Sequence, residues 1–126
     1  MRKEIIISII IIVGIIIADF GLQKYTDRKM ESINNKLTEL KESVNDSENF
    51  DMGKIEEIEN EWEESFKVIT CYLEHDELEK INTQLVIISA GMKVNDKEYV
   101  YEEIDRAIYI ISHVEKKQLF EFDNIL

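Results

Sequence analysis

The first 22 residues contain the feature that most constrains how this chain can fold. An apolar run from Ile5 to Ala18 holds ten isoleucines and no charged residue. Extended to Leu22 it has 18 residues, which as a helix would span about 27 Å, close to the minimum for crossing a bilayer core. Its isoleucines favour insertion by about 3–6 kcal/mol, and Asp19, near one end, opposes this by less than the ~3 kcal/mol of a mid-bilayer acid. We therefore expect residues 1–22 to form a transmembrane anchor, inserted through residues 5–22.

Two other interpretations of this segment fit the sequence less well. A signal peptide cleaved after Ala18 would normally have a polar stretch before the cut, and the chain instead continues amphipathically. A soluble core helix would have a polar face, whereas Ser8 is the only polar residue from Ile5 to Ile17. Both patterns favour the anchor.

The flanking charges bear on the orientation of the anchor. Arg2 and Lys3 precede it, and three basic residues, Lys24, Arg28 and Lys29, follow it, so the positive-inside count nearly balances. A short basic tail followed at once by an apolar run is typical of a signal anchor. We expect the amino terminus in the cytoplasm and the rest of the protein outside the cell membrane.

Residues 23–126 are expected to form one acidic domain. Beyond Glu4 the chain carries 13 basic and 26 acidic residues, a surface that repels nucleic-acid phosphates and anionic lipid headgroups, so we expect no nucleic-acid partner. Proline is absent and glycine occurs four times, which favours helices. The single cysteine, Cys71, lies between Ile69 and Leu73, and we expect it to be a small buried residue.

Four segments carry apolar residues at helical spacing. The first, a seam that continues from the anchor, comprises Met30, Ile33, Leu37, Leu40 and Val44. The other three comprise Ile55, Ile58, Trp62, Phe66, Ile69 and Leu73; Leu78, Ile81, Leu85 and Ile88; and Val100, Ile104, Ile108, Ile111 and Val114. This pattern predicts an all-α fold, in which the anchor runs unbroken into an antiparallel up-down bundle of about four helices.

The boundaries between these segments carry turn and capping signals. We expect a polar linker at residues 45–49, closed by Gly53, and N-caps at Asp76 and Asp96. The third helix should end at Ala90 and Gly91. The tail at 118–126 should dock on the bundle.

Residues with catalytic or metal-binding potential are few. His75, Glu79 one turn later, and His113 could together hold a metal if their helices packed side by side. Neither histidine follows the Glu-x-x-His pattern of di-iron bundles, and no nucleophile elbow, phosphate loop or dinucleotide fingerprint occurs. We expect no enzyme activity and no cofactor, and keep the metal site as an alternative.

Several short matches give a resemblance to a known family. They are Trp62, the run His75, Asp76, Glu77 and Leu78, His113, and the ending Asn124, Ile125 and Leu126. Here the chain resembles domain of unknown function 4363, an uncharacterised membrane-anchored family of clostridia and related Gram-positive bacteria. The resemblance implies a place beside small integral membrane proteins in spore-forming organisms. It brings no catalytic residues, and it marks His75 and Glu77 as a hydrogen-bond pair at a helix boundary.

The sequence thus predicts a non-enzymatic, single-pass accessory protein of the cell envelope. Its helical domain would bind an integral membrane protein or self-associate, with the seam Met30, Ile33, Leu37, Leu40 and Val44 as the contact surface. The alternative is a four-helix ligand or metal-ion sensor that uses His75, Glu79 and His113.

Overall fold

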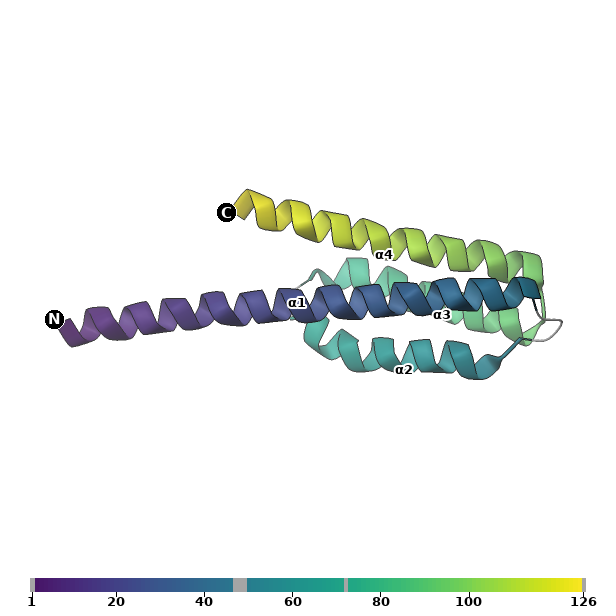
Figure 1. The fold of residues 1–126 in the computed structure, drawn as a ribbon, viewed down its shortest axis with the longest axis horizontal. Coiled ribbons are helices and arrows are strands. Elements are labelled where there is room, and N and C mark those ends of the chain that lie inside the picture. Colours follow the sequence, from purple (N-terminus) through teal and green to yellow (C-terminus); the bar gives the residue numbers. More distant parts are fainter. Residues whose placement is uncertain (1, 47–49, 72, 126) are drawn as a thin grey trace.

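A computed structural model of the chain describes residues 2–46, 50–71 and 73–125, and side chains within residues 2–44, 50–71 and 73–117. Its four helices are α1 (Arg2–Asp46), α2 (Met52–Ile69), α3 (His75–Lys93) and α4 (Lys97–Ile125). They run alternately up and down as a bundle (Figure 1), and α1 and α3 each pack against both α2 and α4. The predicted all-α bundle of four helices is confirmed.

Helix α1 is a single helix of 45 residues, about 68 Å long at about 1.5 Å per residue. Its second half is one wall of the bundle, and most of its first half projects beyond α2 and α3, with the end of α4 reaching part of the way along it (Figure 1). The projecting part is long and apolar enough to cross a membrane, and none of that apolar window is buried within the chain. The predicted continuity between the isoleucine segment and the first bundle helix is confirmed.

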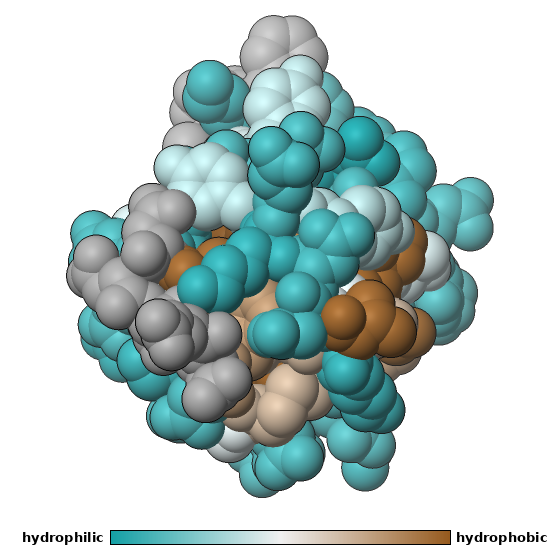
Figure 2. Space-filling model, turned by 90° about the vertical axis from the view of Figure 1, so that its right-hand side faces the viewer, coloured by the Kyte–Doolittle hydropathy of each residue, from teal (hydrophilic) through white to brown (hydrophobic). Residues whose placement is uncertain are grey.

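The core of the bundle is built from the four predicted stripes. Met30, Ile33 and Leu37 of α1 are completely buried, as are Ile55 of α2, Leu78 and Ile88 of α3, and Val100, Ile104 and Ile111 of α4. Burying a side chain of this size contributes about 1.5–3 kcal/mol. The bundle end farthest from the isoleucine segment presents a mostly hydrophilic face with smaller apolar patches (Figure 2). The isoleucines from Ile5 to Ile17, by contrast, are all exposed.

Helix ends follow the capping signals in part. Asp51 caps α2 by accepting a hydrogen bond from the Gly53 amide at 3.0 Å, and the Asp96 carboxylate accepts one from the Tyr99 amide at 3.2 Å. The N-cap position of α3 is Glu74, not Asp76, because the helix already begins at His75. The linker predicted at 45–49 is wrong at Asn45 and Asp46, which belong to the last turn of α1. Its residues 47–49 and the side chains of the tail lie outside the described residues.

Helix α3 ends three residues after Ala90, and the turn that follows has Asn95 at φ 59°. Gly91 therefore lies within the helix and does not terminate it. A Cβ atom at Gly91 would lie 2.9 Å from Val100 Cγ2 and 3.0 Å from Tyr99 Cδ1. The absence of a side chain here allows α3 and α4 to approach closely where they leave their shared turn.

We expect Gly91→Ala to lower the free energy of unfolding by up to about 2 kcal/mol. Overpacking costs about 1–3 kcal/mol, and the better helix propensity of alanine recovers about 1 kcal/mol. Gly21→Ala is the control, because a Cβ there meets nothing within 4 Å. Thermal unfolding of the full chain in detergent, followed by circular dichroism, measures both. A Gly91→Ala chain as stable as Gly21→Ala would contradict this packing.

Candidate functional site

The seam predicted to contact a partner is part of the bundle core. Met30, Ile33 and Leu37 are fully buried, and Leu40 and Val44 are at most 3% exposed. The prediction of a contact surface at these residues is therefore wrong for the folded chain. A stripe with spacings of three and four fits any apolar neighbour, and here α2 and α4 provide that neighbour.

The three candidate metal ligands are only partly brought together. His75 Nε2 lies 3.0 Å from Glu79 Oε1, one turn along α3, and its ring packs edge-on against Phe66 with centroids 5.5 Å apart. His113 instead stacks on Tyr109 of its own helix, with centroids 6.3 Å apart. Within the described part of the chain no three His, Cys, Asp or Glu side chains are grouped so that they could hold a metal ion.

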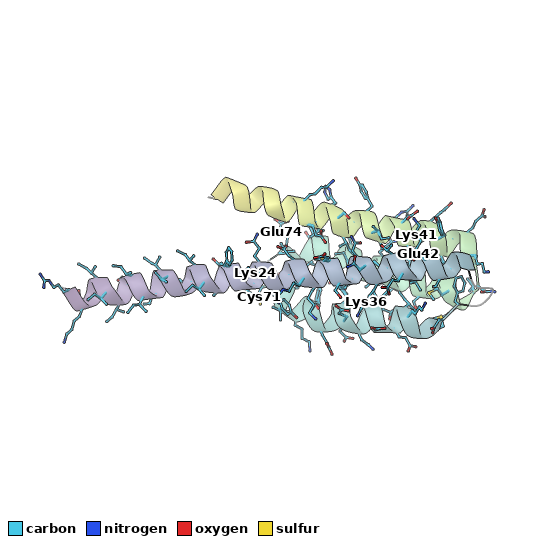
Figure 3. The ribbon with its side chains drawn as sticks, viewed as in Figure 1. Lys24, Lys36, Lys41, Glu42, Cys71 and Glu74 are labelled. Carbon is cyan, nitrogen blue, oxygen red and sulfur yellow. The ribbon has the colours of Figure 1, made fainter. Side chains whose placement is uncertain are left out.

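Two further positions differ from expectation. Cys71 is exposed, because α2 ends at Ile69 and the residue lies in the turn beyond the buried stripe. Glu77 does not pair with His75 in the contacts of the described chain; Lys117 and Lys80 lie 3.3 Å and 3.8 Å from its carboxylate. Both positions flank the same turn, at the bundle end from which α1 projects (Figure 3, where Cys71 is labelled).

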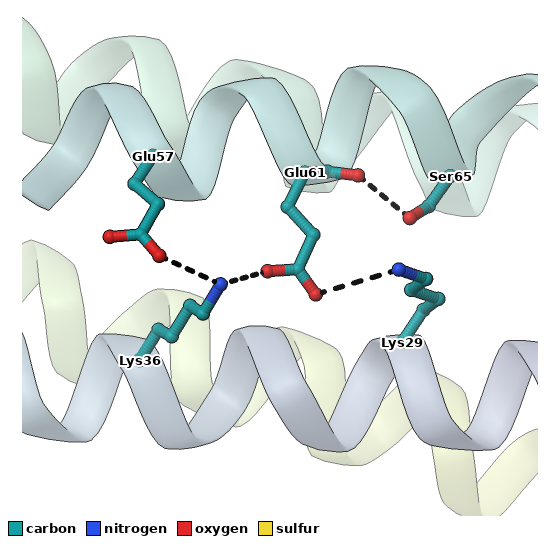
Figure 4. A network of polar contacts seen from close by, with 5 residues as sticks. All are labelled: Lys29, Lys36, Glu57, Glu61 and Ser65. Carbon is teal, nitrogen blue, oxygen red and sulfur yellow. Dashed lines mark hydrogen bonds and ion pairs between the residues drawn. The ribbon is translucent and has the colours of Figure 1, made fainter.

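A network of polar contacts joins α1 to α2 (Figure 4). Lys36 lies between two carboxylates, 3.1 Å from Glu57 and in direct contact with Glu61, and Lys29 lies 4.0 Å from Glu61. The hydrogen bond to Glu61 raises the pKa of Lys36. Burial alone would raise the pKa of Glu61, but hydrogen bonds from Lys36 and Ser32, with the charges of both lysines, lower it. These ionic contacts fix the register of α2 along α1.

The facing surfaces of α1 and α4 bring carboxylates together instead. Burial raises the pKa of Glu115 on α4, and the charges of Asp27 and Glu31 on α1 raise it further. Burial, followed by the charge of Glu31, likewise raises the pKa of Asp27. The Glu115 Oε1 atom is buried and accepts no hydrogen bond in the described structure. Ionisation of this group therefore disfavours the folded bundle.

We expect Glu115→Gln to stabilise the bundle at neutral pH and to lose this advantage in acid. The folded-state pKa of Glu115 lies above its ordinary 4.5, so the folded chain binds this proton more tightly and the cost of ionisation disappears below that value. The gain should not exceed about 1 kcal/mol, because water screens the exposed part of the site. Denaturant unfolding at several pH values measures it, with the exposed Glu56→Gln as control; a gain independent of pH would contradict the assignment.

The described surface of the bundle also has an apolar groove between α2 and α3. It has a volume of ≈ 240 Å³ and is lined by Glu59, Trp62, Glu63, Phe66, Asn82, Leu85 and Val86. Trp62 is nearly buried and donates its indole N–H to the Asn82 amide oxygen, which fixes the ring in the groove floor. Val86 is 66% exposed at the rim. This groove was not predicted from the sequence, although Val86, an apolar residue outside the α3 stripe, is a signal that points to it.

The charges around the groove have one sign. Glu59 and Glu63 line it from α2, and no ion pair to either occurs in the described part of the chain. The Glu59 Oε1 atom is buried without a hydrogen-bond donor. The groove therefore combines an apolar floor with two unpaired carboxylates. Chemically, it is suited to one large apolar side chain with a lysine or arginine beside it.

Comparisons with known proteins identify one family. The sequence profile described as Domain of unknown function (DUF4363) matches residues 20–125. The match covers the whole bundle and begins within the last turn of the apolar segment. No curated protein and no solved structure matches the chain.

Proposed function

The chain belongs to the family described as Domain of unknown function (DUF4363), and we propose that it is a non-enzymatic, single-pass membrane protein whose bundle holds a segment of an integral membrane protein. Residues 5–22 are the membrane span, and the bundle lies on the extracytoplasmic side. Gram-positive origin and a role in sporulation remain expectations drawn from the resemblance.

The anchor is supported by the exposure of its isoleucines. Ile5 to Ile17 project beyond the bundle, and each isoleucine among them is more than half exposed in the isolated chain. Single-chain packing therefore covers none of this surface. An exposed apolar helix of this length is unstable in water and is stabilised by lipid.

The α2–α3 groove carries the proposal of a protein partner. Its ≈ 240 Å³ is below the ~300–1,000 Å³ of typical small-molecule pockets and suits side chains better. Glu61 faces α1 and is next to the groove residue Trp62 in the sequence. It contacts Lys29, which follows Leu22 by seven residues and about 10 Å of helix, so this level of α2 lies near the membrane span. The groove is thus within reach of a partner segment that leaves the membrane. The unpaired Glu59 and Glu63 select a segment with an apolar residue beside a lysine or arginine.

Photocrosslinking tests this proposal in the protein's own membranes. A photoreactive amino acid replaces Val86 at the groove rim, or Val94, an exposed apolar residue in the α3–α4 turn. We expect a discrete adduct with a membrane protein from position 86 and little from position 94. The partner residues that are crosslinked should include an apolar side chain next to a basic one. An adduct of twice the chain mass would instead show self-association.

A charge control separates the groove from nonspecific proximity. Glu59→Gln with Glu63→Gln should weaken the Val86 adduct severalfold, because the two carboxylates are complementary to the partner's basic residue. Losing charges from a partly desolvated contact weakens binding more than losing charges from exposed sites. Glu56→Gln with Glu64→Gln removes the same charge from exposed sites of α2 that do not line the groove and should leave the adduct unchanged. Absence of any adduct from position 86 would contradict the proposal.

A further inference from the structure

A second hollow lies where α1 leaves the bundle. It has a volume of ≈ 550 Å³ and is lined by Gly21, Lys24, Tyr25, Arg28, Lys29 and Ser32 of α1, and by Glu61 of α2. Lys24 lies at this end of the bundle (Figure 3). A Cβ at Gly21 would meet no atom within 4 Å, so this edge of the hollow is open toward the projecting part of α1.

The hollow has excess positive charge. Its one carboxylate, Glu61, is already compensated by Lys29 and Lys36. Lys24 contacts the Phe20 ring, with its Nζ 5.1 Å from the centroid, and neither Lys24 nor Arg28 has an ion pair among the described residues. Two cations therefore line the hollow without a counter-charge. The acidic balance of the whole domain, from which we expected repulsion of anionic headgroups, does not describe this local surface.

The depth of the hollow matches the headgroup layer. Lys24 and Arg28 follow Leu22 by two and six residues on one continuous helix, about 3 Å and 9 Å along the axis. The polar layer on each side of a bilayer core is about 5–7 Å thick. Long basic side chains extend their charges toward this layer. Lys24 therefore lies within this layer when residues 5–22 span the core, and Arg28, which starts just beyond it, can reach back to it with its long side chain.

We propose that this hollow binds the phosphodiester headgroup of an anionic glycerophospholipid, an inference that rests on the membrane anchoring proposed above. Lys24 and Arg28 pair with the phosphate. The hydroxyl of Tyr25, which also lines the hollow, is available to the headgroup's polar substituent, and the volume is within the range of ligand pockets. The bound lipid would hold α1 at the membrane surface through the face of α1 that also contacts α2.

Lipid retention by the full chain tests the proposal. The protein is placed in nanodiscs of phosphatidylcholine mixed with phosphatidylglycerol, and native mass spectrometry counts the lipids that stay bound on release. We expect phosphatidylglycerol to be retained in preference to phosphatidylcholine. Lys24→Gln with Arg28→Gln should weaken this preference about 25-fold, because each basic residue near the surface contributes roughly fivefold.

Two controls make the outcome decisive. Lys54→Gln with Lys93→Gln removes the same charge at exposed sites of the far bundle end and should leave the preference intact. Soluble glycerol phosphate should not displace the lipid. Equal retention in all variants, or displacement by glycerol phosphate, would overturn the proposal. A chain that fails to enter nanodiscs would instead contradict the anchor, so the two failures are distinguishable.

Discussion

One continuous helix, α1, contains both the exposed apolar segment and one wall of the bundle. The hydrogen-bonded ladder of α1 runs from Arg2 to Asp46, with no proline in the chain to break it. The rotation of the helix in the apolar segment therefore fixes its rotation in the bundle. Where Met30 faces the core, Lys24 and Arg28, four residues apart, must share another face. The buried seam and the basic residues of the hollow therefore lie on different faces of α1 because the helix is unbroken between them.

This constraint also determines which surfaces remain for recognition. The apolar seam of α1 begins soon after the isoleucine segment, and α2 and α4 pack on it and bury it. The seam is therefore unavailable to a partner. Contacts across α1 and α2 are attractive, through Lys36 and Glu61, whereas those across α1 and α4 bring together the like-charged carboxylates Asp27 and Glu115, whose pKa values are both raised. The exposed apolar groove is left on the other side of α2, against α3.

The fold was largely predictable and the candidate sites were not. Apolar periodicity identifies each core stripe, because burial on one helix face is a local sequence property, as for Met30 and Ile104. Periodicity does not say which surface covers a stripe, because that depends on the other helices. The seam was for this reason wrongly predicted to contact a partner. Cys71 was predicted to be buried because the end of α2, two residues earlier, has no proline or glycine to mark it. The groove and the basic hollow require two helices at a defined register, which one sequence does not specify.

Coverage of residues 5–22 by lipid can be measured directly by thiol labelling. Cys71 is the single cysteine and is exposed, whereas Ile11 is 56% exposed in the isolated chain and can be protected only from outside the bundle. In open membrane fragments, a hydrophilic maleimide should react readily with Cys71. It should react at least tenfold more slowly with Ile11→Cys in a Cys71→Ser background, because thiols in the bilayer core neither ionise nor meet the reagent. Equal labelling rates at the two positions would contradict the membrane span.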